Sequence, residues 1–139
     1  ILSYDIWFYF SHVVLHSKRY YHIHKEHHTR VTNLKYPDTF VANHLETLIQ
    51  PLGVFIPLMF YPVSIYLFLK INILILIRGM MRHDERCIWL IGNHHILHHK
   101  YPQYNYGEYW LDKLFKTNYP KEDEYIKGLI YLKPFSINL

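Results

Sequence analysis

The stretch TLIQPLGVFIPLMFYPVSIYLFL, residues 47–69, carries no charged side chain, and a second uncharged run, INILILI, follows at residues 71–77. One membrane-spanning helix needs about 20 apolar residues, and the two runs together exceed that length. Pro57 and Pro62 lie near the middle, where they favour a break between two helices. The sequence therefore predicts an all-α integral membrane protein with a transmembrane helical hairpin at about residues 47–81. A buried hairpin of a large soluble protein is the alternative, which the scarcity of polar residues disfavours.

The fifteen Lys and Arg residues indicate where the flanks of this hairpin lie. Five of them fall between Lys18 and Lys35, nine follow Ile77, and Lys70 alone lies within the hydrophobic region. Basic flanks stay in the cytosol, so we expect both flanks there, forming a histidine-rich helical cap. This spread along the flanks, without one basic groove, argues against a nucleic-acid partner despite the formal net charge of +4.

The length of 139 residues suits one domain, residues 1–139. The single cysteine, Cys87, cannot form an internal disulfide, and we expect it to be packed. The chain begins at Ile1 rather than Met, which predicts a protein truncated at its N-terminus. The tail after Asn118 has the composition of a solvated end.

Histidine is the most informative residue type, with twelve copies in the chain. HIHKEHH at residues 22–28 and HHILHH at residues 94–99 share an H-x-x-H-H spacing. Upstream, the predicted helix at residues 4–16 carries an H-x-x-x-H pair, in one stripe with Asp5 and Tyr9. On α-helices these spacings would place the imidazoles of each pattern on one face.

Converging imidazoles supply the lone pairs that a metal ion needs, and they accept Fe, Zn, Cu and Ni. Eight histidines in these patterns are too many for one ion, so the sequence predicts two metals. The eight are His12, His16, His24, His27, His28, His95, His98 and His99.

The other four histidines are weighed one by one. His22 lies about 160° around a helix from the centre of the ligand face, so we expect it to be exposed. His44 is best interpreted as a hydrogen-bonded residue at the mouth of the hairpin. For His94 the sequence leaves two roles open, that of a metal ligand and that of a residue that orients a ligand. His83, just beyond the second hydrophobic run, is a ninth candidate ligand.

Over residues 4–117 the chain resembles the fatty acid hydroxylase and sterol desaturase superfamily of membrane non-haem di-iron enzymes. The resemblance lies in YDIWFYFSHVVLHSKRYYHIHKEHH, in NHLE and in HHILHHKYPQYNYGEYWLDKLF. It implies histidine boxes at residues 12–28 and 83–99, with nine metal ligands: His12, His16, His24, His27, His28, His83, His95, His98 and His99. It also implies supporting residues, or a tenth ligand, among His94, Asp5, Asn105 and Asp112.

Three departures from the family pattern concern substrate binding and the docking of partners rather than the metal ligands of the histidine boxes. Val13 stands where many members have Arg, and Lys116 stands where the pattern ends in Gly. The usual H-P-x-E element lacks its Pro and reads His44, Leu45, Glu46.

The resemblance implies an O₂-dependent oxidoreductase with two iron ions that hydroxylates or desaturates a fatty acyl chain or a sterol reached from the bilayer. No flavin, haem or nicotinamide fingerprint is present, so electrons must come from a partner, in this family a cytochrome of the b type or its equivalent. The expected location is a membrane, which in a eukaryote would be the endoplasmic reticulum, with the boxes facing the cytosol. The substrate, the position oxidised and the choice between the two reactions stay open.

Three alternatives belong to other classes. A zinc hydrolase would need a general base such as Glu26, but the chain has no H-E-x-x-H motif. A metal transporter would carry ionisable residues within its spans, and here the hairpin offers little beyond Gln50, Ser64, Lys70 and Asn72. A catalytically inactive or zinc-loaded metal-binding protein is the third.

Overall fold

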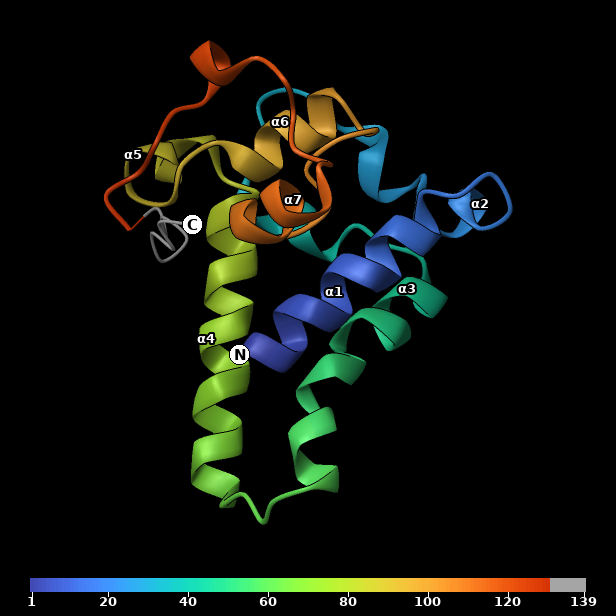
Figure 1. Cartoon of the computed structure of the whole chain (residues 1–139), viewed down its shortest axis with the longest axis vertical. Coiled ribbons are helices and arrows are strands. Elements are labelled where there is room, and N and C mark those ends of the chain that lie inside the picture. The colour runs from blue at the N-terminus through green and yellow to red at the C-terminus, as the bar shows by residue number, and fades with distance from the viewer. Residues whose placement is uncertain (131–139) are drawn as a thin grey trace.

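A computed structural model describes residues 1–130 of the chain, and these contain helices and turns but no strand. The all-α prediction is thus confirmed for this part of the protein. Figure 1 shows a stalk formed by the hairpin and, above it, a group of short helices. The end of the tail, 131–139, lies outside the described residues.

The hairpin has two unequal arms. The first descends through α3 (His44–Ile49) and the 3₁₀ helices η3 (Gln50–Val54) and η4 (Ile56–Met59). The second is one continuous helix, α4 (Ile65–Arg82), which begins where the Ser64 hydroxyl accepts a hydrogen bond from Leu67 N. Phe55 and Phe68 pack between the arms, with ring centroids 5.5 Å apart.

The structure differs here from the prediction of two spanning helices. Of the helices in residues 1–130, none combines the length and the apolar character that crossing a bilayer requires. In the first arm, Pro51 and Pro57 occupy the opening turns of η3 and η4, where a proline lacks the donor that a longer helix would use. In the second arm, Arg78 and Arg82 add two charges to that of Lys70.

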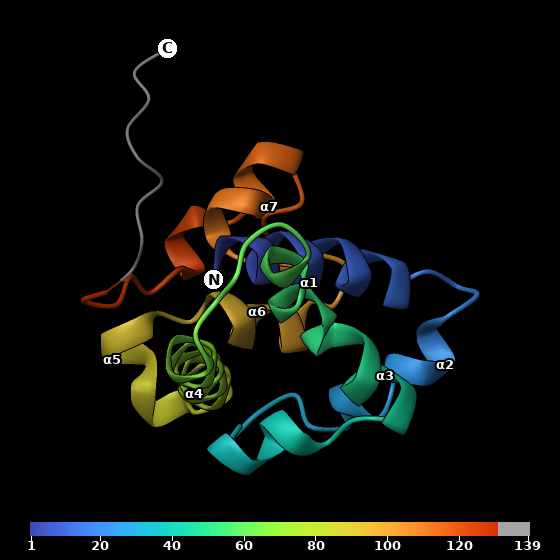
Figure 2. The ribbon, with the colours of Figure 1, turned by 90° about the horizontal axis from the view of Figure 1, so that it is seen from below.

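The first helix, α1 (Leu2–Leu15), lies across the descending arm, as the view from below shows in Figure 2. The Trp7 indole N–H donates to the Ile49 carbonyl at 2.8 Å. At Gly53 the contact is so close that a Cβ atom would lie 2.6 Å from the Trp7 Cβ, so only glycine permits this approach. The contact fixes α1 against the hairpin.

Above the stalk, short helices and turns connect the histidine segments. The α-helices are α2 (Tyr21–His24), α5 (Ile88–Ile91), α6 (His94–Lys100) and α7 (Tyr109–Phe115). The 3₁₀ helices are η1 (His27–Thr29), η2 (Tyr36–Phe40), η5 (Glu85–Cys87) and η6 (Glu122–Glu124).

The interior of this upper part is unusually polar. Leu97 packs with Tyr119 and Tyr125 in a small apolar cluster. The expectation of a solvated end after Asn118 was therefore wrong for these two tyrosines, which cover α6. Sixteen of the buried residues in the described part of the chain are polar or charged, and eight of these are histidines.

Candidate metal centre

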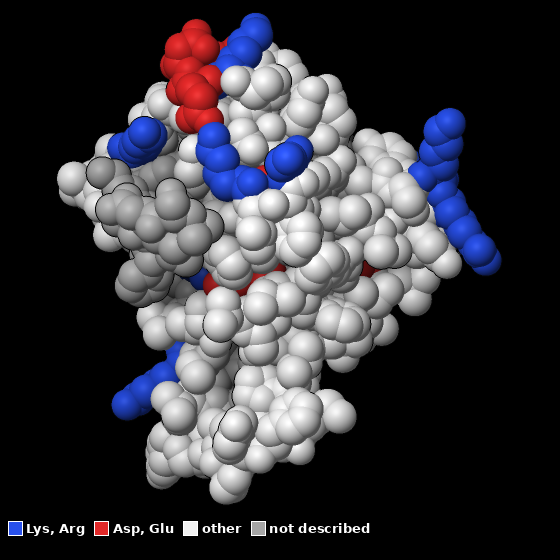
Figure 3. Space-filling view, viewed as in Figure 1, with Lys and Arg blue, Asp and Glu red and all other residues white. Residues whose placement is uncertain are grey.

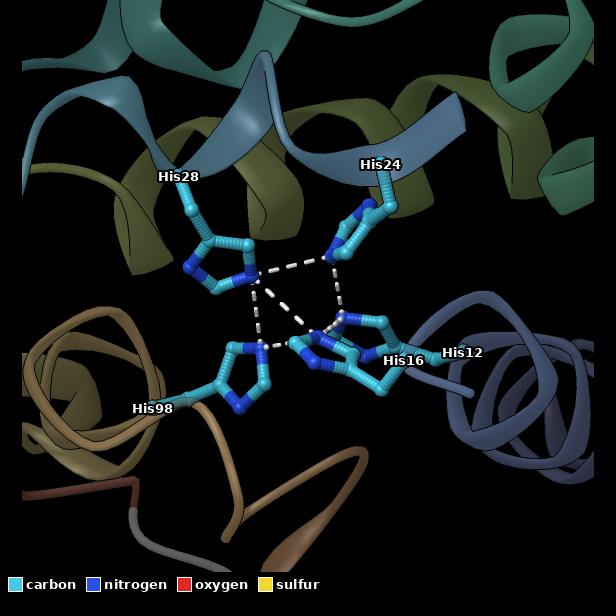
Figure 4. Close-up of side chains that lie close together, drawn as sticks. All are labelled: His12, His16, His24, His28 and His98. Atoms are coloured by element: carbon cyan, nitrogen blue, oxygen red, sulfur yellow. Dashed lines mark hydrogen bonds between the residues drawn. The ribbon is translucent and has the colours of Figure 1, made fainter. Parts of the chain in front are cut away.

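Nine imidazoles converge in two adjoining groups inside the upper part of the fold. Within each group the candidate ligand atoms all lie within 4.8 Å of one another. The five-histidine group, drawn in Figure 4, contains His12, His16, His24, His28 and His98. The four-histidine group contains His27, His83, His95 and His99. These are the nine candidate ligands of the sequence, and the three other histidines belong to neither group.

The two H-x-x-H-H segments divide their histidines between the groups. His24 and His28 belong to the five-histidine group, whereas His27 between them belongs to the four-histidine group. The later segment does the reverse, because its i, i+4 pair lies in the four-histidine group and only His98 points into the five-histidine group.

The expectation that each pattern presents one face was wrong for both segments. At about 100° per residue, positions i and i+4 diverge by about 40°, whereas i+3 and i+4 diverge by about 100°. Residues 22–28 are moreover not one helix, because α2 ends at His24 and η1 begins at His27. Neighbouring histidines therefore reach different groups.

Hydrogen bonds to oxygen atoms fix the orientation of six of the nine rings. A carbonyl oxygen only accepts, so the Nδ1 atom bonded to it must carry the proton, and Nε2 keeps a free lone pair. The pairs are His12 with Tyr106 O (2.5 Å), His98 with Tyr104 O (2.5 Å), His27 with Val41 O (3.0 Å), His83 with Gly79 O (2.8 Å), His99 with Arg30 O (3.1 Å) and His24 with Glu46 Oε1 (2.7 Å).

The resulting lone pairs face one another. The Nε2 atoms of His12 and His24 lie 2.9 Å apart, and those of His27 and His83 also lie 2.9 Å apart. Because His27 and His83 both donate through Nδ1 to carbonyl oxygens, the contact between their Nε2 atoms is not an ordinary hydrogen bond. His99 Nε2 is buried without a partner among the described residues. A cation between the rings would satisfy these nitrogens, so the residues fit bound metal.

Burial keeps the imidazoles neutral. Desolvation, with repulsion from neighbouring imidazoles, lowers the pKa of His16 to about 4, that of His24 to about 2 and that of His99 to about 3. Desolvation also lowers the pKa values of the fully buried His12 and His98 well below 6.5. Neutral imidazole is the form that binds metal, so the site is ready for ligation at pH 7.

Glu46 is a partner of the site that the sequence analysis did not single out. It is 2% exposed and accepts from His24 Nδ1, which orients that ring toward the five-histidine group. Burial, with the charge of Glu26, raises the pKa of Glu46 to about 8, and either protonation state retains an accepting oxygen. The signal that could have indicated it was the H-P-x-E element, here without its Pro. His44 of that element is exposed.

The comparison with family models supplies the identity. The fatty acid hydroxylase model matches residues 1–117. The chain belongs to the fatty acid hydroxylase family. Neither a search of curated proteins nor a search of solved structures found a match. Membership implies an oxidoreductase, and the two histidine groups fit the metal binding that this chemistry requires.

In this fatty acid hydroxylase family member, Asp112 supports the centre from outside. It is fully buried and accepts from Tyr106 N (2.8 Å), Gly107 N (3.0 Å) and His94 Nε2 (2.9 Å). These bonds hold the loop whose Tyr106 carbonyl orients His12. Asp112 thus acts on the centre through the backbone.

The remaining three supporting candidates take different places. Asn105 donates to the His94 carbonyl at 3.1 Å and adopts a positive φ of 61°, a conformation that asparagine tolerates. His94 binds Asp112 and stands outside both groups. Asp5 contacts Arg78 rather than a histidine, so the structure gives it no place beside the metals.

Replacing Asp112 by asparagine should lower both stability and metal content. Each carboxylate oxygen now accepts from two donors, and the amide NH₂ replaces one of these oxygens, so two buried donors lose their acceptor. Each buried donor left unsatisfied costs about 1–3 kcal/mol. We expect a lower melting temperature in detergent and a reduced metal-to-protein ratio. Asp123→Asn, at an exposed position, is the matched control. Equal melting temperatures for the two variants would contradict the role given to Asp112.

A cavity of about 310 Å³ leads to the four-histidine group. His27, His83 and His95 line its inner end, and Gly79 lines the α4 wall. Apolar walls are contributed by Tyr4, Phe8, Phe40, Pro51, Ile75 and Leu76. The cavity thus joins the hairpin to the metal centre.

Proposed function

We propose that the protein is an O₂-dependent di-iron enzyme that hydroxylates or desaturates a C–H bond of a lipid, either a fatty acyl chain or a sterol. The observation that carries the proposal is the cavity that starts beside the hairpin and ends at His27, His83 and His95. Its walls are mostly apolar but also include Arg78, Arg82 and Glu46. A zinc or copper protein without oxidase activity would need the histidines but not this cavity.

Each histidine group would hold one metal ion. Five imidazoles exceed the four ligands of an ordinary tetrahedral zinc site, which favours iron in the five-histidine group. When bound, the two irons supply the activation of O₂. Glu26, the base that a zinc hydrolase would require, is exposed and belongs to neither group, which weighs against hydrolysis.

The residues of the chain hold the imidazoles in position and exclude water from the cavity. The carbonyl partners and Glu46 hold the imidazoles before metal binds, so little reorganisation is needed. The apolar walls would exclude water and orient an alkyl chain with one carbon beside the four-histidine group. Hydroxylation follows when oxygen is inserted into the C–H bond, and desaturation follows when a second hydrogen is removed.

The hairpin is the part that we propose to enter the membrane. Its turn region exposes large apolar side chains, among them Met59 (79%), Phe60 (70%) and Tyr66 (76%). Contiguous exposed apolar surface of this kind indicates a membrane or protein contact. We propose the endoplasmic reticulum of a eukaryotic cell, with both histidine groups on the cytosolic side and electrons supplied by a b-type cytochrome or its equivalent.

Lipid analysis tests this function. Cells that express the full-length protein should accumulate a lipid that has gained one oxygen or lost two hydrogens, detected by mass spectrometry. Cells that express His98→Ala should not, because His98 contributes to the five-histidine group. An unchanged lipidome, with iron loaded and a reductase present, would favour an inactive metal-binding protein.

A further inference from the structure

The two histidine groups are approached by separate routes. The members of the four-histidine group are all buried, and the cavity that reaches them is walled by α1, η2, α3, η3 and α4. The five-histidine group includes His16 and His28, which stay partly exposed. An open groove of about 470 Å³ lies against His16 on the outer surface. No residue lines both the groove and the cavity.

A molecule bound in the groove would be separated from the rest of the five-histidine group by the His16 ring alone. It is lined by His16, Lys18, Tyr21, Pro102, Gln103 and Tyr106. His16 Nε2 lies 3.1 Å from His98 Nε2 and 3.3 Å from His12 Nε2. The Tyr106 ring lies 5.1 Å, and the Tyr21 ring 5.8 Å, from the His16 ring, centroid to centroid. An electron that arrives in the groove therefore crosses a single imidazole to reach the centre.

The rim of the groove is cationic. Lys18 lines the groove, and it and the next residue, Arg19, are exposed and form no ion pair with another described residue. No acidic side chain lines the groove. Figure 3 shows basic side chains that project from the edge of the molecule where α1 is followed by α2. Such a surface attracts an acidic protein and speeds its association.

We propose that an acidic one-electron carrier protein docks in this groove and delivers electrons through His16, while the substrate is oxidised beside the four-histidine group. The inference rests on the proposed function, which creates the demand for electrons. Hydroxylation places one atom of O₂ in the C–H bond and releases the other as water. This consumes two protons and two electrons, so two reduced carrier molecules are oxidised per product.

A lipid surface fits the groove less well. Many exposed apolar side chains of the hairpin lie toward the foot of the stalk, whereas the segment between α1 and α2 lies at the side of the upper part of the molecule in Figure 1. A bilayer that surrounds the hairpin turn would leave the groove in water, where a soluble domain can reach it.

The test uses the full chain, loaded with iron in nanodiscs of neutral phosphatidylcholine, and the reduced, acidic haem domain of a b-type cytochrome as probe. Lys18→Glu should slow haem reoxidation about tenfold at low ionic strength, relative to turnover driven by a small-molecule reductant. The difference should shrink at about 0.5 M NaCl, where screening is strong. Affinity for the oxidised haem domain, measured by surface plasmon resonance, should fall in parallel. Lys127→Glu, an equal charge change at an exposed site outside the groove, should alter neither.

The outcomes separate this proposal from the function on which it rests. Equal effects of Lys18→Glu and Lys127→Glu would overturn it, because only net charge would then matter. So would unchanged carrier kinetics combined with weaker binding of Lys18→Glu to anionic vesicles, which would make the rim a lipid-contacting surface. If no lipid product forms with any reductant, yet the haem domain still binds in a Lys18-dependent way, the docking site stands and the proposed oxidation fails.

Discussion

Changing His28 to alanine should remove most of the bound metal and lower lipid product by about 100-fold or more. His28 Nε2 lies 3.0 Å from His24 Nε2 and 3.2 Å from the Nε2 atoms of both His16 and His98, so it connects three histidine segments. Loss of a residue that merely supports a ligand typically weakens metal binding by about 10–100-fold, and a ligand itself should cost at least as much. Elemental analysis of the purified protein and lipid mass spectrometry measure the two effects.

Two neighbours in the same heptapeptide are matched controls. His22→Ala should leave metal content and product nearly unchanged, because His22 is exposed and belongs to neither group. Glu26→Gln should likewise be tolerated, whereas a hydrolase that used Glu26 as its base would lose turnover. Equal losses in His22→Ala and His28→Ala would contradict the placement of these rings.

A leucine in place of Gly79 should block the cavity without emptying the metal centre. Gly79 lines the cavity one helical turn before His83, and a Cβ atom there would meet only the Thr39 Cγ2 atom, at an ordinary 3.4 Å. The backbone accepts the change, while the added side chain occupies space next to the four-histidine group. A displacement of about 1 Å at a reacting atom can cost about 100-fold, and we expect a loss of that order for long-chain substrates.

The series Gly79→Ala, Gly79→Val and Gly79→Leu makes this expectation quantitative. Turnover should fall with side-chain volume, while the metal-to-protein ratio stays constant. A parallel loss of metal would show instead that the substitutions act through the Gly79 carbonyl, which accepts from His83 Nδ1 at 2.8 Å. Turnover of a long acyl chain that is indifferent to the series would place the substrate elsewhere.

The proximity of two histidines one turn apart could be predicted, because it follows from their spacing along the chain. His12 lies in the last turn of α1 and His16 directly follows the helix, one turn on, and the structure places both in the same group. The assignment of His27 and His98 to different groups could not be predicted, because it depends on how distant segments pack. The orienting carbonyls of Val41 and Tyr106 were equally invisible, since every residue has a carbonyl and only the fold decides which one meets a histidine.

In the hairpin, the position of the turn could be predicted but the structure of the first arm could not. Hydropathy indicated the position of the turn, and the chain does reverse before Ile65. Composition does not reveal that the first arm shortens into 3₁₀ turns, because that outcome depends on where Pro51 and Pro57 fall and on the packing of Gly53 against Trp7. Similarly, Tyr119 and Tyr125 follow no helical period, so their burial over α6 had no signal in the sequence.

The reciprocal division of the two H-x-x-H-H segments makes the metal sites interdependent. Each segment contributes an i, i+4 pair to one group and its remaining histidine to the other, so a single short stretch of backbone tethers ligands of both ions. A metal ion in one group adds a restraint to the stretch that also carries ligands of the other group, and its loss withdraws that restraint. Such thermodynamic coupling disfavours a singly loaded protein, and metal uptake should be cooperative, with the two ions entering and leaving as a unit.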